Sequence, residues 1–467
     1  MTSLAALLED LEVAEVVGGD PRDVEVTSVT QDSTAVVAGS LYCCIRGSRV
    51  DGHDLAPAVV DDGARSLLVE RIVDVAVPQV RVDSTRESVA PVAAAFWGHP
   101  SRRLSVVGVT GTNGKTTTTH LLVTVLRTAG HKSGLLGTLS GSRTTPEAPV
   151  LQGRLAAFLE EGCEAVAMEV SSIALDQHRV DAIDFSVGVW TNLTQDHLDY
   201  HHDMESYFAA KAALFEPGRC RLAVLNRDDR WAVRLGGSLT IPVVTYGLDD
   251  AEKLSLDTTG SQFCWRGHTV RLPLGGVHNV ANALAAATAA EAMGIDPRVI
   301  AEGLAEVPVV PGRWEVVDAG QPFTVVVDYA HTPDGLEHVL RAARSSVGGG
   351  SRVIVVFGCG GDRDRAKRPL MAATATRLAD VAVLTSDNPR GEDPLAIIDE
   401  VAAGADPAGT LVIEPDREQA IALALDDAAE GDLVIVAGKG HETGQVVGDR
   451  LIPFDDRAVA RRLLTGS

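Results

Sequence analysis

The stretch Leu104-Ser-Val-Val-Gly-Val-Thr-Gly-Thr-Asn-Gly-Lys-Thr-Thr-Thr-Thr119 predicts the fold of the chain around it. Residues 104–109 are mostly apolar and β-branched, as in a parallel strand that is buried on both faces. The turn from Gly111 to Thr116 then leads into a segment of helical periodicity that ends near Gly130. Such a turn directs backbone N–H groups and the positive end of a helix at one point. The stretch therefore predicts an anion site within an α/β sheet.

The residues of the turn are those of a phosphate-binding loop. Lys115 supplies a point charge for the β- and γ-phosphates, and Thr116 supplies a hydroxyl for Mg²⁺. The match is incomplete, because the general pattern has a glycine where this chain has Val109. A glycine-rich turn that binds nothing is the alternative. The position of Gly-Lys-Thr between a strand and a helix favours an ATP site.

The composition is that of a cytosolic protein with several domains. A chain of 467 residues is too long for one hydrophobic core. The net charge of −23 argues against nucleic-acid and membrane partners. Six scattered cysteines lack zinc-ligand spacing, which favours reduced thiols, and the N-terminus lacks the features of a signal peptide. We therefore expect a cytoplasmic monomer without a membrane span.

Three α/β domains are predicted, at residues 1–98, 99–312 and 313–467. The first alternates short β-rich pieces with helical ones; the strands are expected at 24–29, 41–45, 66–69 and 79–82, and the helices at 54–61 and 88–97. The second begins at the phosphate loop and repeats strand and helix. In the third, strands expected at 323–328, 352–357, 381–385, 411–413 and 433–437 alternate with helices, which predicts a mostly parallel sheet.

Polar residues at strand ends are the candidate site of the second domain. Glu169 ends an apolar strand at 165–170, where a carboxylate is rare unless it is paired or bound to a metal. A satisfied hydrogen bond is the alternative. The next strand leads to Asn192, Asp196, His197 and Asp199, at the edge where a doubly wound sheet places its chemistry. His197 alone could equally be a solvated loop residue, and spacing alone assigns Lys211 to the surface.

Two further features extend this candidate site. Asn279 and Asn282 fall on one face of an alanine-rich helix, near its N-terminus. Helix capping explains one of them, and a ligand explains both. Polar sets also follow four strands of the third domain: Asp328-Tyr-Ala-His331, Asp362–Arg368, Asp387-Asn-Pro-Arg390 and Gly438-Lys-Gly-His-Glu442. We expect these four sets to converge in one crevice.

Taken in order, these residues resemble the Mur ligase family from about Ser28 to Phe454. The resemblance rests on nine motifs: Gly111-Thr-Asn-Gly-Lys-Thr-Thr117, Met168-Glu-Val-Ser-Ser172, Gln177-His-Arg179, Asn192-Leu, Asp196-His-Leu-Asp-Tyr-His201, His278-Asn279, Asp328-Tyr-Ala-His331, Asp387-Asn-Pro-Arg390 and Gly438-Lys-Gly-His-Glu442. It implies an N-terminal UDP-binding domain, a central P-loop ATPase-type domain and a C-terminal Rossmann-like domain. Thr34 stands where the family usually has arginine, and Ile173 replaces a common histidine.

The resemblance implies an ATP-dependent ligase that uses small molecules. The family converts a carboxylate to an acyl phosphate, which an amine then attacks to give an amide, ADP and phosphate. The pattern is most similar to members that add meso-diaminopimelate to UDP-N-acetylmuramoyl-L-alanyl-D-glutamate in peptidoglycan synthesis. Arg390 favours diaminopimelate over lysine, because a guanidinium can hold the second carboxylate that lysine lacks. A related Mur or folylpolyglutamate-type ligase for another amino acid, and a non-ligating ATP-dependent switch, are the alternatives.

The resemblance also implies a role for each matching residue. Catalytic roles fall to Lys115, Glu169, His197 and Lys211, and the expected Mg²⁺ ligands are Thr116, Glu169, His197 and a carbamylated Lys211. The ATP contacts are Gly111, Thr112, Asn113, Gly114, Lys115, Thr116, Thr117, Asn279, Arg313, Asp328 and Lys367. The muramoyl-peptide contacts are Ser33, Thr144, Thr145, Ser171, Gln177 and Arg179. The diaminopimelate contacts are Arg363, Asp387, Asn388, Pro389, Arg390, Gly438 and Glu442.

Overall fold

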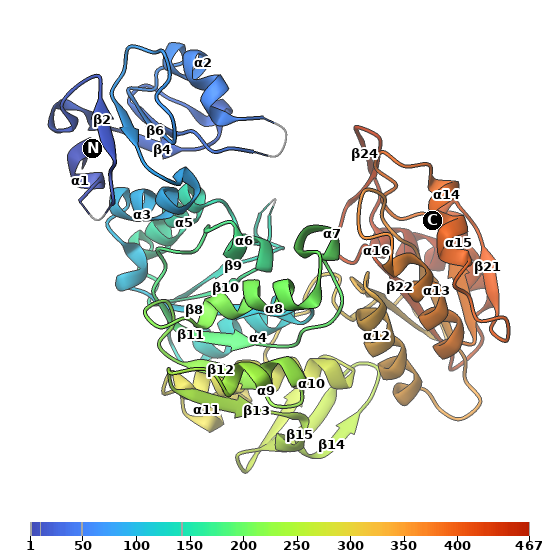
Figure 1. Cartoon of the computed structure of the whole chain (residues 1–467). Coiled ribbons are helices and arrows are strands. Elements are labelled where there is room, and N and C mark those ends of the chain that lie inside the picture. The colour runs from blue at the N-terminus through green and yellow to red at the C-terminus, as the bar shows by residue number, and fades with distance from the viewer. Residues whose placement is uncertain (1, 10, 48–49, 142, 467) are drawn as a thin grey trace.

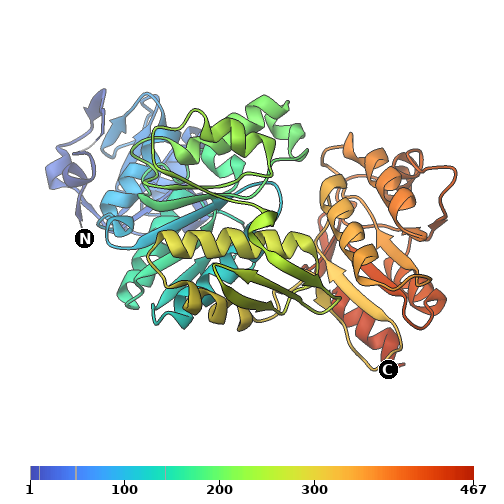
Figure 2. The same ribbon diagram turned by 90° about the horizontal axis from the view of Figure 1, so that it is seen from below.

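The computed structural model describes residues 2–9, 11–47, 50–141 and 143–466. The chain forms three successive α/β parts, each around a mainly parallel sheet (Figure 1). The C-terminal part lies to one side of the central part, and the view turned by 90° shows the same separation (Figure 2). The exact boundaries at 98/99 and 312/313 stay our interpretation.

The N-terminal part contains a five-stranded sheet in the order β2-β7-β6-β5-β4. Its elements are α1 (Leu4–Leu7), β2 (Glu15–Val17), β4 (Ser28–Thr30), β5 (Ser40–Cys43), α2 (Ala56–Asp61), β6 (Ser66–Val69), β7 (Gln79–Arg81) and α3 (Thr85–Phe96). The single strand predicted at 24–29 is wrong: β3 (Glu25–Val26) pairs with β1 (Thr2–Ser3), and only β4 joins the main sheet. Thr27 bonds to Ala38 and Gly39 between them, so the chain changes sheets at that residue.

The central part is a six-stranded, wholly parallel sheet in the order β13-β12-β11-β8-β10-β9. Its strands are β8 (Ser105–Thr110), β9 (Ser133–Leu136), β10 (Ala165–Glu169), β11 (Phe185–Trp190), β12 (Ala223–Asn226) and β13 (Val243–Tyr246). Alternate residues of β8 enter two different cores, Val107 and Val109 on one face and Val106 on the other. Burial on both faces explains the continuous apolar run read from the sequence.

Helices cover both faces of this sheet, and a small antiparallel sheet adjoins it. The helices are α4 (Lys115–Thr128), α5 (Ala148–Glu160), α6 (Ser172–Asp176), α7 (Leu198–His201), α8 (Met204–Ala212), α9 (Arg230–Gly236), α10 (Val277–Ala292) and α11 (Pro297–Ala305). The added sheet consists of β14 (Glu252–Leu256), β15 (Ser261–Trp265) and β16 (His268–Leu272). Helices α4 and α10 pack together in the core that holds Val107, which places the N-terminus of α10 beside the phosphate loop.

The C-terminal part contains a six-stranded sheet in the order β17-β18-β22-β19-β20-β21, of which only the edge strand β17 is antiparallel. Its elements are β17 (Glu315–Val316), β18 (Thr324–Asp328), α12 (Pro333–Ser346), β19 (Val353–Phe357), α13 (Lys367–Leu378), β20 (Val381–Leu384), α14 (Pro394–Ala402), β21 (Leu411–Ile413), α15 (Arg417–Asp427), β22 (Leu433–Ala437), β23 (Gly444–Val447), β24 (Arg450–Pro453) and α16 (Asp456–Thr465). The predicted mostly parallel sheet is confirmed. Helix α12 lies on the side that faces the central part (Figure 1).

Candidate active site

The phosphate loop joins β8 to α4 in a compact turn with two left-handed glycines. Gly111 has φ 147° and Gly114 has φ 87°, which only glycine adopts without strain. A Cβ atom on Gly114 would lie 2.3 Å from Oδ1 of Asn282, so α10 approaches the loop backbone closely. Asn192 braces the other side: its backbone oxygen accepts the Thr112 N–H and its side-chain oxygen accepts the Asn113 N–H. The loop is therefore built before any ligand arrives.

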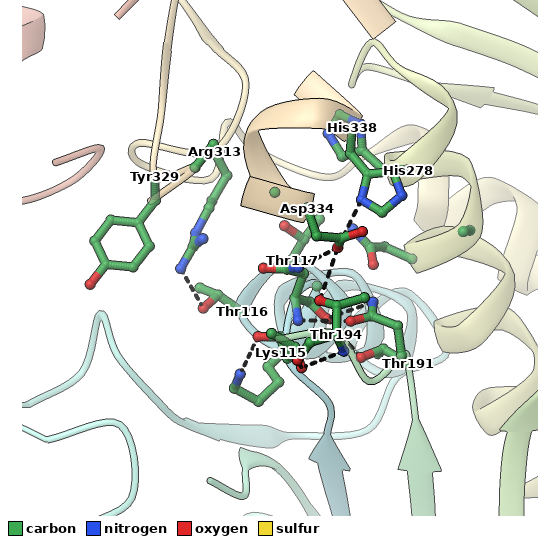
Figure 3. A pocket seen from close by; sticks show the side chains of 18 of the residues that line it. Lys115, Thr116, Thr117, Thr191, Thr194, His278, Arg313, Tyr329, Asp334 and His338 are labelled. Carbon is green, nitrogen blue, oxygen red and sulfur yellow. Dashed lines mark hydrogen bonds and ion pairs between the residues drawn. The ribbon is translucent and has the colours of Figure 1, made fainter. Parts of the chain in front are cut away.

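Lys115 begins α4 and folds back over the loop (Figure 3). Its ammonium donates to the carbonyl oxygens of Gly111 and Thr112, at 2.8 Å each. Burial lowers the pKa of Lys115, and Glu169 acts in the opposite direction. The hydrogen bonds of Lys115 go to neutral carbonyl oxygens and not to a carboxylate, which leaves its ammonium able to meet an incoming anion.

Glu169 ends β10 and is buried, as the sequence predicts. Its Oε2 accepts the hydroxyl of Thr116 at 3.0 Å, and its Oε1 accepts the N–H of Thr138 at 2.8 Å. Glu169 therefore has satisfied hydrogen bonds and can also have a functional role. With Thr116 it forms a pair of hard oxygen donors beside the phosphate loop. Oxygen donors of this kind suit Mg²⁺. Within the described ranges, no cluster of three or more His, Cys, Asp or Glu side chains could hold a metal ion.

Lys211 is buried, so the surface position inferred from spacing alone is wrong. Its exposed fraction is 1%, and its ammonium donates to the carbonyl oxygen of Gly111 at 2.8 Å. The ammonium lies 4.8 Å from the centre of the Tyr207 ring. Burial, aided by the nearby charge of Lys115, holds the pKa of Lys211 well below its ordinary value. The neutral amine is therefore accessible at a pH where a solvated lysine is charged.

His197 lies on the loop after β11 with φ 54°, and its Nε2 is 3.4 Å from Oδ2 of Asp196. His197 and Asp196 line two cavities at once. The larger, about 480 Å³, contains the phosphate loop, Glu169 and α10. The smaller, about 170 Å³, is lined mainly by the C-terminal part. Tyr329 and His331 also line both cavities, which therefore meet at the junction of the two sheets.

The three residues expected near adenine and ribose, Asn279, Arg313 and Asp328, line the larger cavity, and so does Asn282. Neither asparagine caps α10, whose N-cap is Gly276; Asn279 instead donates to the Gly275 carbonyl at 2.8 Å. Arg313 donates to the Thr116 hydroxyl at 3.1 Å and lies 4.5 Å over the Tyr329 ring. Asp328 accepts the backbone N–H groups of Trp314 and Ala330, and burial raises its pKa.

Five of the expected muramoyl-peptide contacts form one hydrogen-bonded group. Thr145 donates to the Glu169 carbonyl oxygen at 2.9 Å, and Arg179 donates to the Thr145 carbonyl oxygen at 2.9 Å and to Gln177 at 2.6 Å. Thr144 and Ser171 line the larger cavity. Ser33 stands apart from this group. Its neighbour Asp32 lines a third cavity, of about 320 Å³, between β4 and α5.

The four polar sets of the third sheet converge as predicted. The smaller cavity is lined by members of each, including Tyr329, Arg363, Lys367, Asp387, Asn388, Arg390, Gly438 and Glu442. Pro389 is buried and is not among the lining residues. Arg390 has φ 51° and donates to the Gly361 carbonyl oxygen at 2.9 Å, and burial lowers its pKa. Two carboxylates of the cavity, Asp364 and Asp387, each have a buried oxygen without a hydrogen-bond partner among the described residues.

Sequence reasoning missed two residues that act across long distances. Asp334, in the first turn of α12, accepts the side chains of Asn113 at 2.9 Å and Thr194 at 3.1 Å, and so ties the C-terminal part to the phosphate loop (Figure 3). Lys439 is fully buried beside the smaller cavity. It belongs to a motif that the sequence singled out, yet nothing in its spacing indicates three side-chain contacts.

No described helix is both long and apolar enough to cross a membrane.

Family models match three successive stretches of the chain. The Mur ligase family catalytic domain matches residues 25–97, the Mur ligase middle domain residues 109–290, and the Mur ligase glutamate ligase domain residues 312–440. These matches confirm the predicted α/β architecture of three domains, with a central ATPase-type and a C-terminal Rossmann-like unit.

Relatives match over nearly the whole length. The UDP-N-acetylmuramoyl-L-alanyl-D-glutamate–2,6-diaminopimelate ligase of Geobacillus thermodenitrificans is 49% identical and covers 95% of each chain. The enzyme of that name from Streptomyces coelicolor is 46% identical, over 99% of this chain and 96% of its own.

Solved structures are also similar to this chain over nearly its whole length. One of a UDP-N-acetylmuramoyl-L-alanyl-D-glutamate–2,6-diaminopimelate ligase has a TM-score of 0.69 at 30% identity, over 100% of this chain and 99% of the other. The MurF ligase of Thermotoga maritima, solved with ADP, shares the fold with a TM-score of 0.65 at 19% identity, over 95% and 97%. On these matches, the chain belongs to the Mur ligase family.

Proposed function

We propose that this chain is an ATP-dependent ligase that joins meso-diaminopimelate to UDP-N-acetylmuramoyl-L-alanyl-D-glutamate, a step of peptidoglycan precursor synthesis. The observation that carries the proposal is the meeting of two cavities at Asp196, His197, Tyr329 and His331. One cavity contains a phosphate loop, and the other is lined by both guanidinium and carboxylate groups. The names of the relatives at 43–49% identity supply the two substrates.

The reaction follows from the chemistry of carboxylates. A carboxylate cannot expel oxide, so its oxygen first takes the γ-phosphoryl group of ATP, which gives an acyl phosphate and ADP. The uncharged amine of diaminopimelate then attacks the acyl carbon, phosphate leaves with the C–O electron pair, and the amine loses a proton to give the amide. Charge collects on phosphoryl oxygens, where Lys115 and the loop N–H groups stabilise it.

The Mg²⁺ assignments rest on the donor atoms. Thr116 and Glu169 would hold one ion through hard oxygens that already lie 3.0 Å apart. His197 and Lys211 would hold a second, provided that the Lys211 amine has added CO₂ to form a carbamate, with loss of one proton. The lowered pKa of Lys211 supports this modification, because only the neutral amine reacts. Bound Mg²⁺ would neutralise phosphate charge.

The remaining roles follow the positions of the cavities. We assign the peptide end of the nucleotide substrate to Thr144, Thr145, Ser171, Gln177 and Arg179, and its UDP end to the side of Ser33. The adenine and ribose contacts are Asn279, Arg313 and Asp328, and Lys367 meets the phosphates from the C-terminal part. Diaminopimelate takes the smaller cavity, where Arg363 and Arg390 meet carboxylates and Asp387 and Glu442 meet ammonium groups. We also propose that the protein works as a monomer in the cytoplasm, where ATP is available.

Phosphate release under defined substrate combinations tests the proposal. The purified protein is given ATP and Mg²⁺ with UDP-muramoyl-dipeptide, with an amino acid, with both, or with neither. We expect release only with both co-substrates, and with diaminopimelate rather than lysine. Equal release with lysine indicates a different amino-acid specificity, and release without either co-substrate indicates a switch rather than a ligase.

A further inference from the structure

Lys439 occupies the turn after β22 with its side chain at 0% exposure. A buried ammonium is costly unless it is fully hydrogen-bonded. Its Nζ donates to the Gly444 carbonyl oxygen at 2.6 Å, to Oε2 of Glu442 at 3.0 Å and to Oδ1 of Asn388 at 3.2 Å. An ammonium has three N–H groups. All three are used inside the protein, so Lys439 does not itself bind a substrate.

These contacts fix how Asn388 and Glu442 are presented. Oδ1 of Asn388 also accepts the backbone N–H of Val446 at 2.9 Å. The two donors, Lys439 and Val446, fix the orientation of the Asn388 side-chain amide, with its oxygen toward them. The Asn388 amide nitrogen then donates to Oε2 of Glu442 at 2.8 Å. Oε2 of Glu442 is thereby engaged twice, whereas no hydrogen bond from a described residue reaches its Oε1. Asn388 and Glu442 both line the smaller cavity.

Lys439 also compensates the charge of a second carboxylate. Its Nζ is 3.9 Å from Oδ1 of Asp387, a buried oxygen that accepts no hydrogen bond from the described residues. Two carboxylates beside one small cavity would repel each other without a nearby cation. Lys439 places a positive charge beside both carboxylates, and each keeps an oxygen free of hydrogen bonds from the described residues for a positively charged ligand group.

We propose that Lys439 is a positioning residue for the amino-acid substrate. It acts through Asn388 and Glu442, which it orients by hydrogen bonds, and through Asp387, beside which it places a positive charge, so that the ammonium groups of the diamino acid meet preformed acceptors. The contact with Gly444, together with the bond from the Arg390 N–H to the Val446 oxygen at 3.0 Å, joins the β23–β24 hairpin to the same site. The assignment rests on the proposed function, since that function gives the cavity to the amino acid.

The first test is Lys439→Met, which keeps much of the side-chain volume and removes the donors. We expect the KM for diaminopimelate to rise about tenfold, because partners left unsatisfied lose their orientation. The KM for ATP and for UDP-muramoyl-dipeptide should change by less than about twofold. Asp432→Asn is the matched control: Asp432 is buried and bonds Arg352 and Ala429 at the amino end of β22, whereas Lys439 follows its carboxyl end. It should lower the Tm without changing the KM for diaminopimelate.

A double variant separates positioning from a general loss of packing. If Lys439 acts through Glu442, Lys439→Met combined with Glu442→Gln should have about the same KM for diaminopimelate as Glu442→Gln alone. Additive effects, an unchanged KM in Lys439→Met, or an equal rise for ATP would each overturn the assignment. If Lys439→Met does not fold, Lys439→Arg replaces it, because a planar guanidinium cannot address the same three acceptors; an unchanged KM there also overturns it. Wild-type protein that releases no phosphate with diaminopimelate overturns the proposed function first, and is measured first.

Discussion

The phosphate loop and the smaller cavity of the C-terminal part, here called the cleft, both lie at the carboxyl ends of parallel strands. Their buried lysines, however, have different hydrogen-bond partners. At the loop, Lys115 and Lys211 donate to the same neutral acceptor, the Gly111 carbonyl oxygen. In the cleft, Lys439 donates to the carboxylate of Glu442 and lies near Asp387. The hydrogen bonds of the two loop lysines thus go to neutral carbonyl oxygens, with Glu169 and Asp196 nearby, whereas Lys439 is hydrogen-bonded directly to a carboxylate.

This difference indicates what each site can bind. An ammonium group such as that of Lys115, which no carboxylate holds by a hydrogen bond among the described residues, can meet a polyanion such as a triphosphate. A balanced set of guanidinium and carboxylate groups favours a zwitterion, whose ammonium and carboxylate groups each find an opposite partner. Substitutions on the two sides should therefore have separable effects.

Removing a loop cation should have the largest effect. In Lys211→Ala, we expect phosphate release to fall by at least about a hundredfold, because the variant loses both the buried amine and the carbamate proposed to form on it. Short carboxylates added to the assay should restore part of the activity. Lys132→Ala, at an exposed lysine of the same domain, serves as the control. An unimpaired Lys211→Ala would refute the role proposed for Lys211 beside the loop.

Removing a cleft cation should affect one substrate selectively. In Arg390→Ala, we expect the KM for diaminopimelate to rise about ten- to a hundredfold, as for a lost charged hydrogen bond, with little change for ATP. Steady-state kinetics with each substrate varied in turn measures the split. Arg365→Ala, at an exposed arginine paired with Glu400, should change neither value. Equal increases for both substrates would show that the two sites are not separable.

The smallest effect is expected where the two regions touch. The hydrogen bond that the His338 ring donates to the Asp334 carboxylate raises the pKa of His338, against the effect of burial. The stabilisation from this pair is therefore complete below the ordinary histidine pKa of about 6.5 and is lost as the pH rises through the raised value. With His338 partly exposed, we expect less than about 1 kcal/mol.

Unfolding of wild type and His338→Gln at several pH values measures this contribution. The difference in unfolding free energy should be larger near pH 5.5 than near pH 8.5, values about one to two units on either side of the histidine pKa. A difference that is the same at both ends would contradict the ion pair. His268, a partly buried histidine on β16, supplies the comparison: the same substitution there should show no such trend.

Local patterns carried most of the fold prediction. The strand, glycine-rich turn and helix at 105–128 lie next to one another in the sequence, and the strand ends of the third sheet follow from one rule of topology. The single strand expected at 24–29 failed because Thr27 bonds to residues that are distant in sequence. Local periodicity does not indicate which distant residues a strand pairs with.

The residues of the candidate site also fall into those that local sequence predicted and those whose contacts lie far away in the sequence. Thr116 and Glu169 were expected together, and they are hydrogen-bonded. Lys211 was placed at the surface by spacing because its contact, Gly111, is 100 residues away. The contacts of Lys439 with Asn388 and of Asp334 with Asn113 also cross between elements. The sequence around Lys211, Lys439 and Asp334 gives no indication of these contacts, which form only in the folded chain.

The close approach of Gly114 to Asn282 restricts how this protein can diverge. Even one methyl group at position 114 would overlap the asparagine oxygen at 2.3 Å. A smaller residue at position 282 would remove that overlap but not the backbone strain at φ 87°, so position 114 should tolerate only glycine, whichever residue stands at 282.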